Sequence, residues 1–201
     1  GYSSGFVYGR PDNETIREAE AVLAMLEQAK AGALLFSSGM AAATAVFQAL
    51  DPGDHIVAPR VMYWALRNWL MTEAARWGLL VTFCETDDLS RLKAAVQPGK
   101  TRLVWIETPS NPLWTITDIA AAAEIAHEAG AKLAVDSTCA SPVHTQPLLL
   151  GADVVMHAAT KILNGHSDVV AGALAAREDD AFWQRIKTIR KMQGGILGPF
   201  E

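Results

Sequence analysis

The sequence predicts an α/β fold with a mostly parallel central sheet and helices on both faces. Short apolar runs of strand length alternate with segments of helix length from one end of the chain to the other, which is typical of α/β proteins. Of the 201 residues, 50% are hydrophobic and 19% are charged, the profile of a folded protein with a large core. We therefore expect one large domain.

Each expected element has its own signal in the sequence. Apolar residues recur at helical spacing through residues 15–30, and Gly32 follows them as a stop signal. A turn at residues 51–54 precedes the next strand. The pattern of strand and helix then repeats to the last helix. The expected strands are residues 33–36, 56–58, 79–83, 103–106, 133–135, 154–157 and 170–174, and the expected helices are residues 15–30, 41–50, 63–77, 89–96, 119–129 and 180–192.

Charge and composition argue against several classes of protein. The net charge is -5, and lysine and arginine are scattered rather than clustered, so we expect no nucleic-acid partner. No apolar run approaches the ~18 residues that span a bilayer, and no signal peptide is visible. Cys84 and Cys139 lack the spacing of a metal site and are interpreted as free thiols. We expect a cytoplasmic protein without a membrane partner or a bound metal.

Three groups at predicted strand ends fit one cofactor. Lys161 follows a strand and offers an amine that can form an imine with a carbonyl cofactor. Asp136 ends another strand and can keep a pyridine nitrogen protonated, so that the ring accepts electrons. Ser38, Gly39 and Met40 open a helix, whose N-terminus favours a phosphate. These groups match the aldehyde, the pyridine nitrogen and the phosphate of pyridoxal 5'-phosphate (PLP).

Each of these residues also has a purely structural interpretation. Lys161 alone would be a surface lysine in a loop, and Ser38 a plain helix N-cap. Asp136 could cap the turn that it begins with Ser137 and Thr138. Their joint order along the chain, each at the carboxyl end of a strand, favours the cofactor site.

Further candidates have weaker signals. Tyr63 could stack on the cofactor ring, although an aromatic residue on such a helix is more often part of the core. Asn111 lies in a proline-bounded loop and could reach the phenolic oxygen of the cofactor, with a structural turn as the alternative. Thr160 offers a hydroxyl to an anion. His157 and His166 could be acid–base groups, but His157 lies within a strand and is interpreted as a core histidine.

The order of these motifs resembles the Cys/Met-metabolism family of PLP enzymes. This family includes cystathionine γ-synthases, cystathionine γ- and β-lyases, methionine γ-lyases and O-acyl-homoserine sulfhydrylases. The resemblance implies the large domain of a fold type I PLP-dependent transferase. The matching stretches lie along nearly the whole chain: Tyr8-Gly-Arg10, Asp12-Asn-Glu-Thr15, Ser38-Gly-Met-Ala-Ala42, Pro52-Gly-Asp-His55, Tyr63, Glu107-Thr-Pro-Ser-Asn-Pro112, Val135-Asp-Ser-Thr138, Leu150-Gly-Ala-Asp153 and Thr160-Lys161 with Asn164-Gly-His-Ser-Asp168.

The resemblance implies a role for each site residue. Lys161 would be the Schiff-base lysine, Asp136 the partner of the pyridine nitrogen, and Tyr63 the stacking and acid–base tyrosine. Asn111 would face the phenolic oxygen. The phosphate would be bound by Gly39, Met40 and Thr160 of this chain and by Tyr8 and Arg10 of a neighbouring subunit.

The resemblance also implies an assembly and a domain plan. Family members form tetramers made of two catalytic dimers. We expect residues 1–201 to be a PLP-binding large domain with an N-terminal arm at about residues 1–14. The chain starts and stops abruptly, and the small C-terminal domain that supplies the family's substrate-carboxylate arginine is absent from these residues.

Three positions depart from the family pattern. Ala158 stands where the family has the serine of Ser-x-Thr-Lys, so one phosphate hydroxyl is missing. Glu14 replaces the proline of Asn-Pro-Thr, and Ser137 replaces the asparagine of Asp-Asn-Thr, which we expect to be tolerated.

The leading functional hypothesis is a PLP-dependent lyase or transferase acting on a sulfur amino acid or an activated homoserine. Elimination or replacement would take place at the β or γ carbon of the substrate. The alternative is a non-catalytic PLP-fold protein with a role in assembly or regulation. A nicotinamide-binding domain is excluded because no GxGxxG motif follows the first strand.

Overall fold

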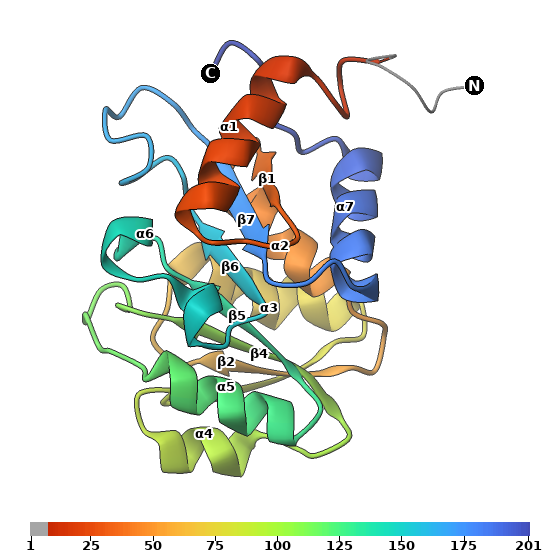
Figure 1. Cartoon of the computed structure of the whole chain (residues 1–201). Helices are drawn as coiled ribbons and strands as arrows, with labels where there is room; N and C mark the ends of the chain where they lie inside the picture. The colour runs from red at the N-terminus through yellow and green to blue at the C-terminus, as the bar shows by residue number, and fades with distance from the viewer. Residues whose placement is uncertain (1–7) are drawn as a thin grey trace.

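The computed structural model describes residues 8–201, in which seven strands form one sheet with helices packed on both faces (Figure 1). The strand order is β1-β7-β6-β5-β4-β2-β3. Neighbouring strands pair in parallel except β7, which is antiparallel to β1 and β6. The predicted fold class is confirmed. The strands are β1 (Ala33–Phe36), β2 (His55–Pro59), β3 (Leu80–Cys84), β4 (Thr101–Glu107), β5 (Lys132–Asp136), β6 (Val154–His157) and β7 (Gly172–Ala176).

Two layers of helices cover the sheet. Leu133 and Val135 of β5 pack in a cluster with α1, α4 and α5, whereas Ala134 between them packs in a cluster with α2, α3 and α7. Burial on both faces explains why the inner strands are continuous apolar runs, whereas the edge strand β3 is only partly buried. In Figure 1, α4 and α5 lie together at the bottom of the view and α7 runs along the right. The helices are α1 (Glu14–Leu26), α2 (Gly39–Gln48), α3 (Trp64–Arg76), α4 (Leu89–Ala95), α5 (Ile119–Glu128), α6 (Ser141–His144), the 3-10 helix η1 (Pro147–Leu150) and α7 (Ala181–Gln193).

Within residues 8–201, none of the helices combines the length and the apolar character that crossing a membrane requires.

The structure differs from the sequence prediction at several element boundaries. Helix α1 ends at Leu26 rather than at residue 30, because Gln28 adopts a left-handed φ of 56° that a right-handed helix cannot continue. The last strand lies two residues further along than predicted, because its antiparallel register pairs Gly172 with Phe36. Helices α6 and η1 were not predicted, since four residues are too few to show a helical period.

The carboxyl ends of the parallel strands meet at one edge of the sheet. Glu107 ends β4 and Asp136 ends β5, and the two residues are Cα partners on adjacent strands. The reversed strand β7 begins at the same edge, where Gly172 pairs with the last residue of β1, Phe36. The loops after β1, β4, β5 and β6 are thereby gathered at this edge, where α/β sheets bind their ligands.

Candidate functional site

A cavity of about 520 Å³ lies at the C-terminal edge of the sheet. Its walls come from the loops after five strands, which are far apart in the sequence. The structure thus brings together eight of the ten predicted site residues: Ser38, Gly39, Met40, Tyr63, Asn111, Asp136, Thr160 and Lys161.

One end of the cavity is the N-terminus of α2. Ser38 caps this helix, with its hydroxyl accepting a hydrogen bond from the N–H of Ala41 at 3.0 Å. The N–H groups of Gly39 and Met40 find no acceptor among the described residues, and both residues line the cavity. An anion is the natural partner for such N–H groups.

Close packing of two glycines shapes this end of the cavity. A Cβ atom on Gly172 would lie 2.0 Å from the carbonyl oxygen of Ser38, so only glycine allows β7 to approach the loop before α2. A Cβ atom on Gly39 would lie 2.8 Å from the Cβ of Ala158. Ala158 therefore packs directly against the N-terminus of α2.

Asp136 is a buried carboxylate with one oxygen fixed and one left for a ligand. The N–H of Thr138 donates to Oδ1 at 3.0 Å, and the hydroxyl of Thr138 donates to the same oxygen at 2.5 Å. No described residue donates to Oδ2, although Asp136 is only 6% exposed. Burial raises the pKa of Asp136, and the two hydrogen bonds from Thr138 oppose this. A cation held against Oδ2 would favour the ionised form.

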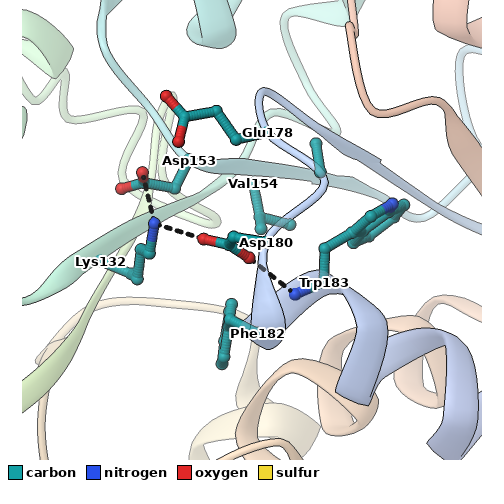
Figure 2. A pocket seen from close by; sticks show the side chains of 8 residues that line it. Lys132, Asp153, Val154, Glu178, Asp180, Phe182 and Trp183 are labelled. Carbon is teal, nitrogen blue, oxygen red and sulfur yellow. Dashed lines mark hydrogen bonds and ion pairs between the residues drawn. The ribbon is translucent and has the colours of Figure 1, made fainter.

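Lys161 brings an amine to the same cavity. It lies in the turn between β6 and β7, and no ion pair of the described residues involves it. Lys132 lies at the opposite edge, where Figure 2 shows its amine between the carboxylates of Asp153 and Asp180, at 3.3 and 2.7 Å. Lys132 is held in ion pairs away from the cavity, whereas Lys161 is the lysine among the described residues that line it, so Lys161 is placed to attack a carbonyl there.

The structure also places residues that sequence analysis gave no role. The carboxylate of Glu107 accepts hydrogen bonds from the N–H groups of Tyr63 and Asn111, each at 2.7 Å. The hydroxyl of Thr138 accepts the N–H of Ala158 at 2.8 Å while it donates to Asp136. Both residues belong to the stretches that carry the family resemblance, but only their contacts with distant segments show what they do.

Thr160 and Ala158 limit how this chain can bind a phosphate. The hydroxyl of Thr160 donates to the carbonyl oxygen of Ala171 at 3.1 Å and accepts the N–H of Ala171 at 2.9 Å. Its single proton is therefore in use, and Thr160 would have to break that bond to donate to a phosphate. The N–H of Ala158 already donates to Thr138. Gly39 and Met40 are the donors best placed for the phosphate.

Ala158→Ser is expected to tighten PLP binding, because the new hydroxyl would lie beside the N-terminus of α2. We expect a gain smaller than the ~1.5–3 kcal/mol of a full hydrogen bond to a charged group, since a water can satisfy the phosphate at this place. The dissociation constants come from cofactor titration of the apo protein, with the exposed Ala94→Ser on α4 as the control. Weaker binding would show that this side chain does not face the phosphate.

Tyr8 and Arg10 do not line the cavity of their own chain. The Arg10 guanidinium lies 5.3 Å from the ring centroid of Tyr8 and donates to the carbonyl oxygen of Lys191, near the end of α7. The predicted contact with a neighbouring subunit remains a prediction.

The two histidines differ in their surroundings. His157 is buried in β6, and its Nε2 lies 2.5 Å from Oε1 of the buried Glu27. The interpretation of His157 as a core histidine is thus confirmed, but only Nε2 has a partner, because the buried Nδ1 has none among the described residues. His166 is exposed, and its Nδ1 lies 2.8 Å from the carbonyl oxygen of Asn164.

The model of a family described as "Cys/Met metabolism PLP-dependent enzyme" matches residues 1–201. The chain belongs to this family. It is 44% identical to the cystathionine gamma-synthase of Mycobacterium tuberculosis, over 100% of this chain and 51% of that protein. It is 40% identical to the cystathionine gamma-lyase of Bacillus subtilis, over 99% of this chain and 52% of that protein.

The fold agrees with solved structures of this family. The cystathionine gamma-lyase of Lactobacillus plantarum, solved with L-serine, matches with a TM-score of 0.95 and 36% identity, over 99% of this chain and 51% of that one. The chain thus spans about half the length of these relatives. PLP is the cofactor of the family, and the cavity fits it: a helix N-terminus for the phosphate, an amine for the aldehyde, and the buried Oδ2 of Asp136 for the ring nitrogen.

Proposed function

We propose that the full-length protein is a PLP-dependent lyase or transferase of sulfur amino-acid metabolism. It would catalyse elimination or replacement at the β or γ carbon of cystathionine, methionine, cysteine or O-acyl-homoserine, and a cystathionine γ-synthase or γ-lyase reaction is favoured. The observation that carries this proposal is the meeting of Lys161, Asp136 and the N-terminus of α2 in one cavity. The names of the relatives, cystathionine gamma-synthase and cystathionine gamma-lyase, support the substrate class.

Each residue would have a distinct task in this chemistry. When bound, PLP draws electrons from the α-carbon of an amino acid, so that the α-proton can leave. Lys161 would attach the cofactor and, once released, accept and return that proton. Asp136 would keep the ring nitrogen protonated through Oδ2. Tyr63, whose side chain lines the cavity and is 46% exposed, would stack on the ring and can exchange protons.

A substrate panel tests the proposal. Purified full-length protein is expected to absorb as a PLP enzyme and to release a thiol or a keto acid from at least one of cystathionine, methionine, cysteine and an O-acyl-homoserine. Bound cofactor without turnover of any of these four would contradict it. No observation on the described residues favours the non-catalytic alternative.

Assembly and location form a second part of the proposal. We infer a tetramer made of two catalytic dimers, in which Tyr8 and Arg10 bind the phosphate of a neighbouring subunit. The supporting observation is that neither residue lines the cavity of its own chain. We also infer that residues 1–201 are the PLP-binding large domain, with an arm before α1, and that the protein is cytoplasmic.

Arg10→Ala is expected to weaken PLP binding by ~1.5–3 kcal/mol, the value of a hydrogen bond between charged groups that are largely desolvated. The measurement combines cofactor titration with the oligomeric state from light scattering. Arg17→Ala is the matched control, because Arg17 lies nearby and pairs with Asp12 in its own chain. A stable monomer that keeps the same PLP affinity would rule out the contact between subunits.

A further inference from the structure

Glu107 joins two walls of the cavity. Its Oε2 accepts the N–H of Tyr63, at the start of α3, and its Oε1 accepts the N–H of Asn111, in the loop after β4. Both distances are 2.7 Å, the short range expected for a charged acceptor. Tyr63, Asn111 and Glu107 all line the cavity, and Glu107 is only 5% exposed.

We propose that Glu107 is a positioning residue whose ionised carboxylate holds Tyr63 and Asn111 in place around the cofactor, and that its protonation loosens both walls. This inference rests on the proposed function, because it takes the side chains of Tyr63 and Asn111 to face bound PLP. The proton balance is simple: one proton from solvent neutralises Glu107, and a neutral carboxyl is a weaker acceptor for at least one of the two N–H groups.

The residues around Glu107 determine the pH at which its carboxylate is protonated. Asp136 lies next to Glu107 on β5, and Cys139 lies in the turn after β5. Lys161, in the turn after β6, lines the same cavity. Burial, followed by repulsion from Asp136, raises the pKa of Glu107 to about 7. The two N–H donors oppose this rise without cancelling it. A change of pH near neutrality would therefore shift Glu107 between its two states.

Amide hydrogen exchange in the full-length apo protein tests the proposal directly. The amides of Tyr63 and Asn111 are followed by NMR from acidic to alkaline pH and corrected for the intrinsic pH dependence of exchange. We expect the protection of both amides to fall by about tenfold or more as the pH drops through about 7. A change of this size corresponds to the loss of a hydrogen bond to a charged group. Glu107→Gln, which cannot ionise, should keep the protection of the two amides at every pH near the level that the unmodified protein shows at acidic pH.

Glu124→Gln removes an exposed carboxylate on α5 and should leave the pH profile of the two amides unchanged. Protection that is independent of pH in the unmodified protein would overturn the proposal without any variant, and so would a Glu107→Gln protein with the unmodified profile. Because the apo protein is measured, a failure of PLP to attach at Lys161 would contradict the proposed function and leave this test intact.

The cofactor provides a second readout. In the holoenzyme, the dichroism of the PLP band reports the placement of groups around the ring. The band should change in the same pH range as the exchange of the Tyr63 amide, and Glu107→Gln should fix it in the low-pH form. A band that follows pH identically in both proteins would assign the titration to another group.

Discussion

Replacement of Lys161 by alanine is expected to abolish covalent attachment of PLP and to lower turnover of the full-length protein by at least ~10²-fold, the lower end for a positioned acid–base group. Lys161 lines the cavity and takes part in no ion pair of the described residues, so its amine is available for reaction. Borohydride reduction followed by peptide mapping should place the cofactor on Lys161 in the unmodified protein and nowhere in Lys161→Ala.

Two other lysines serve as controls. Lys191→Ala changes an exposed residue of α7 and should retain the adduct and the activity. Lys132→Ala removes an amine that pairs with Asp153 and Asp180, so it should lower stability while PLP still attaches to Lys161. An adduct on Lys132 or Lys191 in the unmodified protein would refute the assignment.

The residues predicted correctly as neighbours share a local signature. Ser38, Asp136 and Lys161 each follow a short apolar run, and parallel strands bring their carboxyl ends to one edge of the sheet. Their positions in the sequence therefore predict that they lie together at this edge. The direction of β7 could not be predicted in this way, because an apolar run alone does not show that a strand is antiparallel to its neighbours.

The residues given no role in advance depend on contacts between distant segments. Glu107 binds the amide of Tyr63, 44 residues earlier in the chain, and Thr138 binds the amide of Ala158, 20 residues later. Gly172 matters because the Ser38 carbonyl lies against it. None of these contacts has a spacing that periodicity or a motif could show. The same is true of Thr160, whose hydroxyl is in use by the backbone of Ala171.

Asp136→Ala is expected to keep the fold and to lower turnover by more than about tenfold, because an unprotonated pyridine is a poor electron acceptor. The side chain is buried, so its removal also relieves the cost of holding a carboxylate away from water. Activity and far-ultraviolet dichroism are measured together, with the exposed Asp87→Ala as control. Near-normal turnover would show that the cofactor ring lies elsewhere in the cavity.

The same substitution should change how the stability of the apo protein depends on pH. Burial raises the pKa of Asp136, and burial with repulsion from Asp136 raises that of Glu107 from 4.5 to about 7. Between pH 4.5 and about 7 the folded state therefore binds more protons than the unfolded state. The free energy of unfolding falls as the pH rises through this range. For Glu107 alone the fall is on the order of 3 kcal/mol.

Asp136→Ala removes one of these two groups and the charge that repels the other, so the fall in stability should become smaller. Urea midpoints of the apo proteins, measured from pH 4.5 to about 7, would show a flatter profile for Asp136→Ala than for Asp87→Ala. Addition of PLP to the unmodified protein should flatten the profile in the same way, because a protonated ring nitrogen against Oδ2 favours the ionised carboxylate. Parallel profiles in all these proteins would mean that the two carboxylates do not share the burial and repulsion inferred from their adjacent positions on β4 and β5.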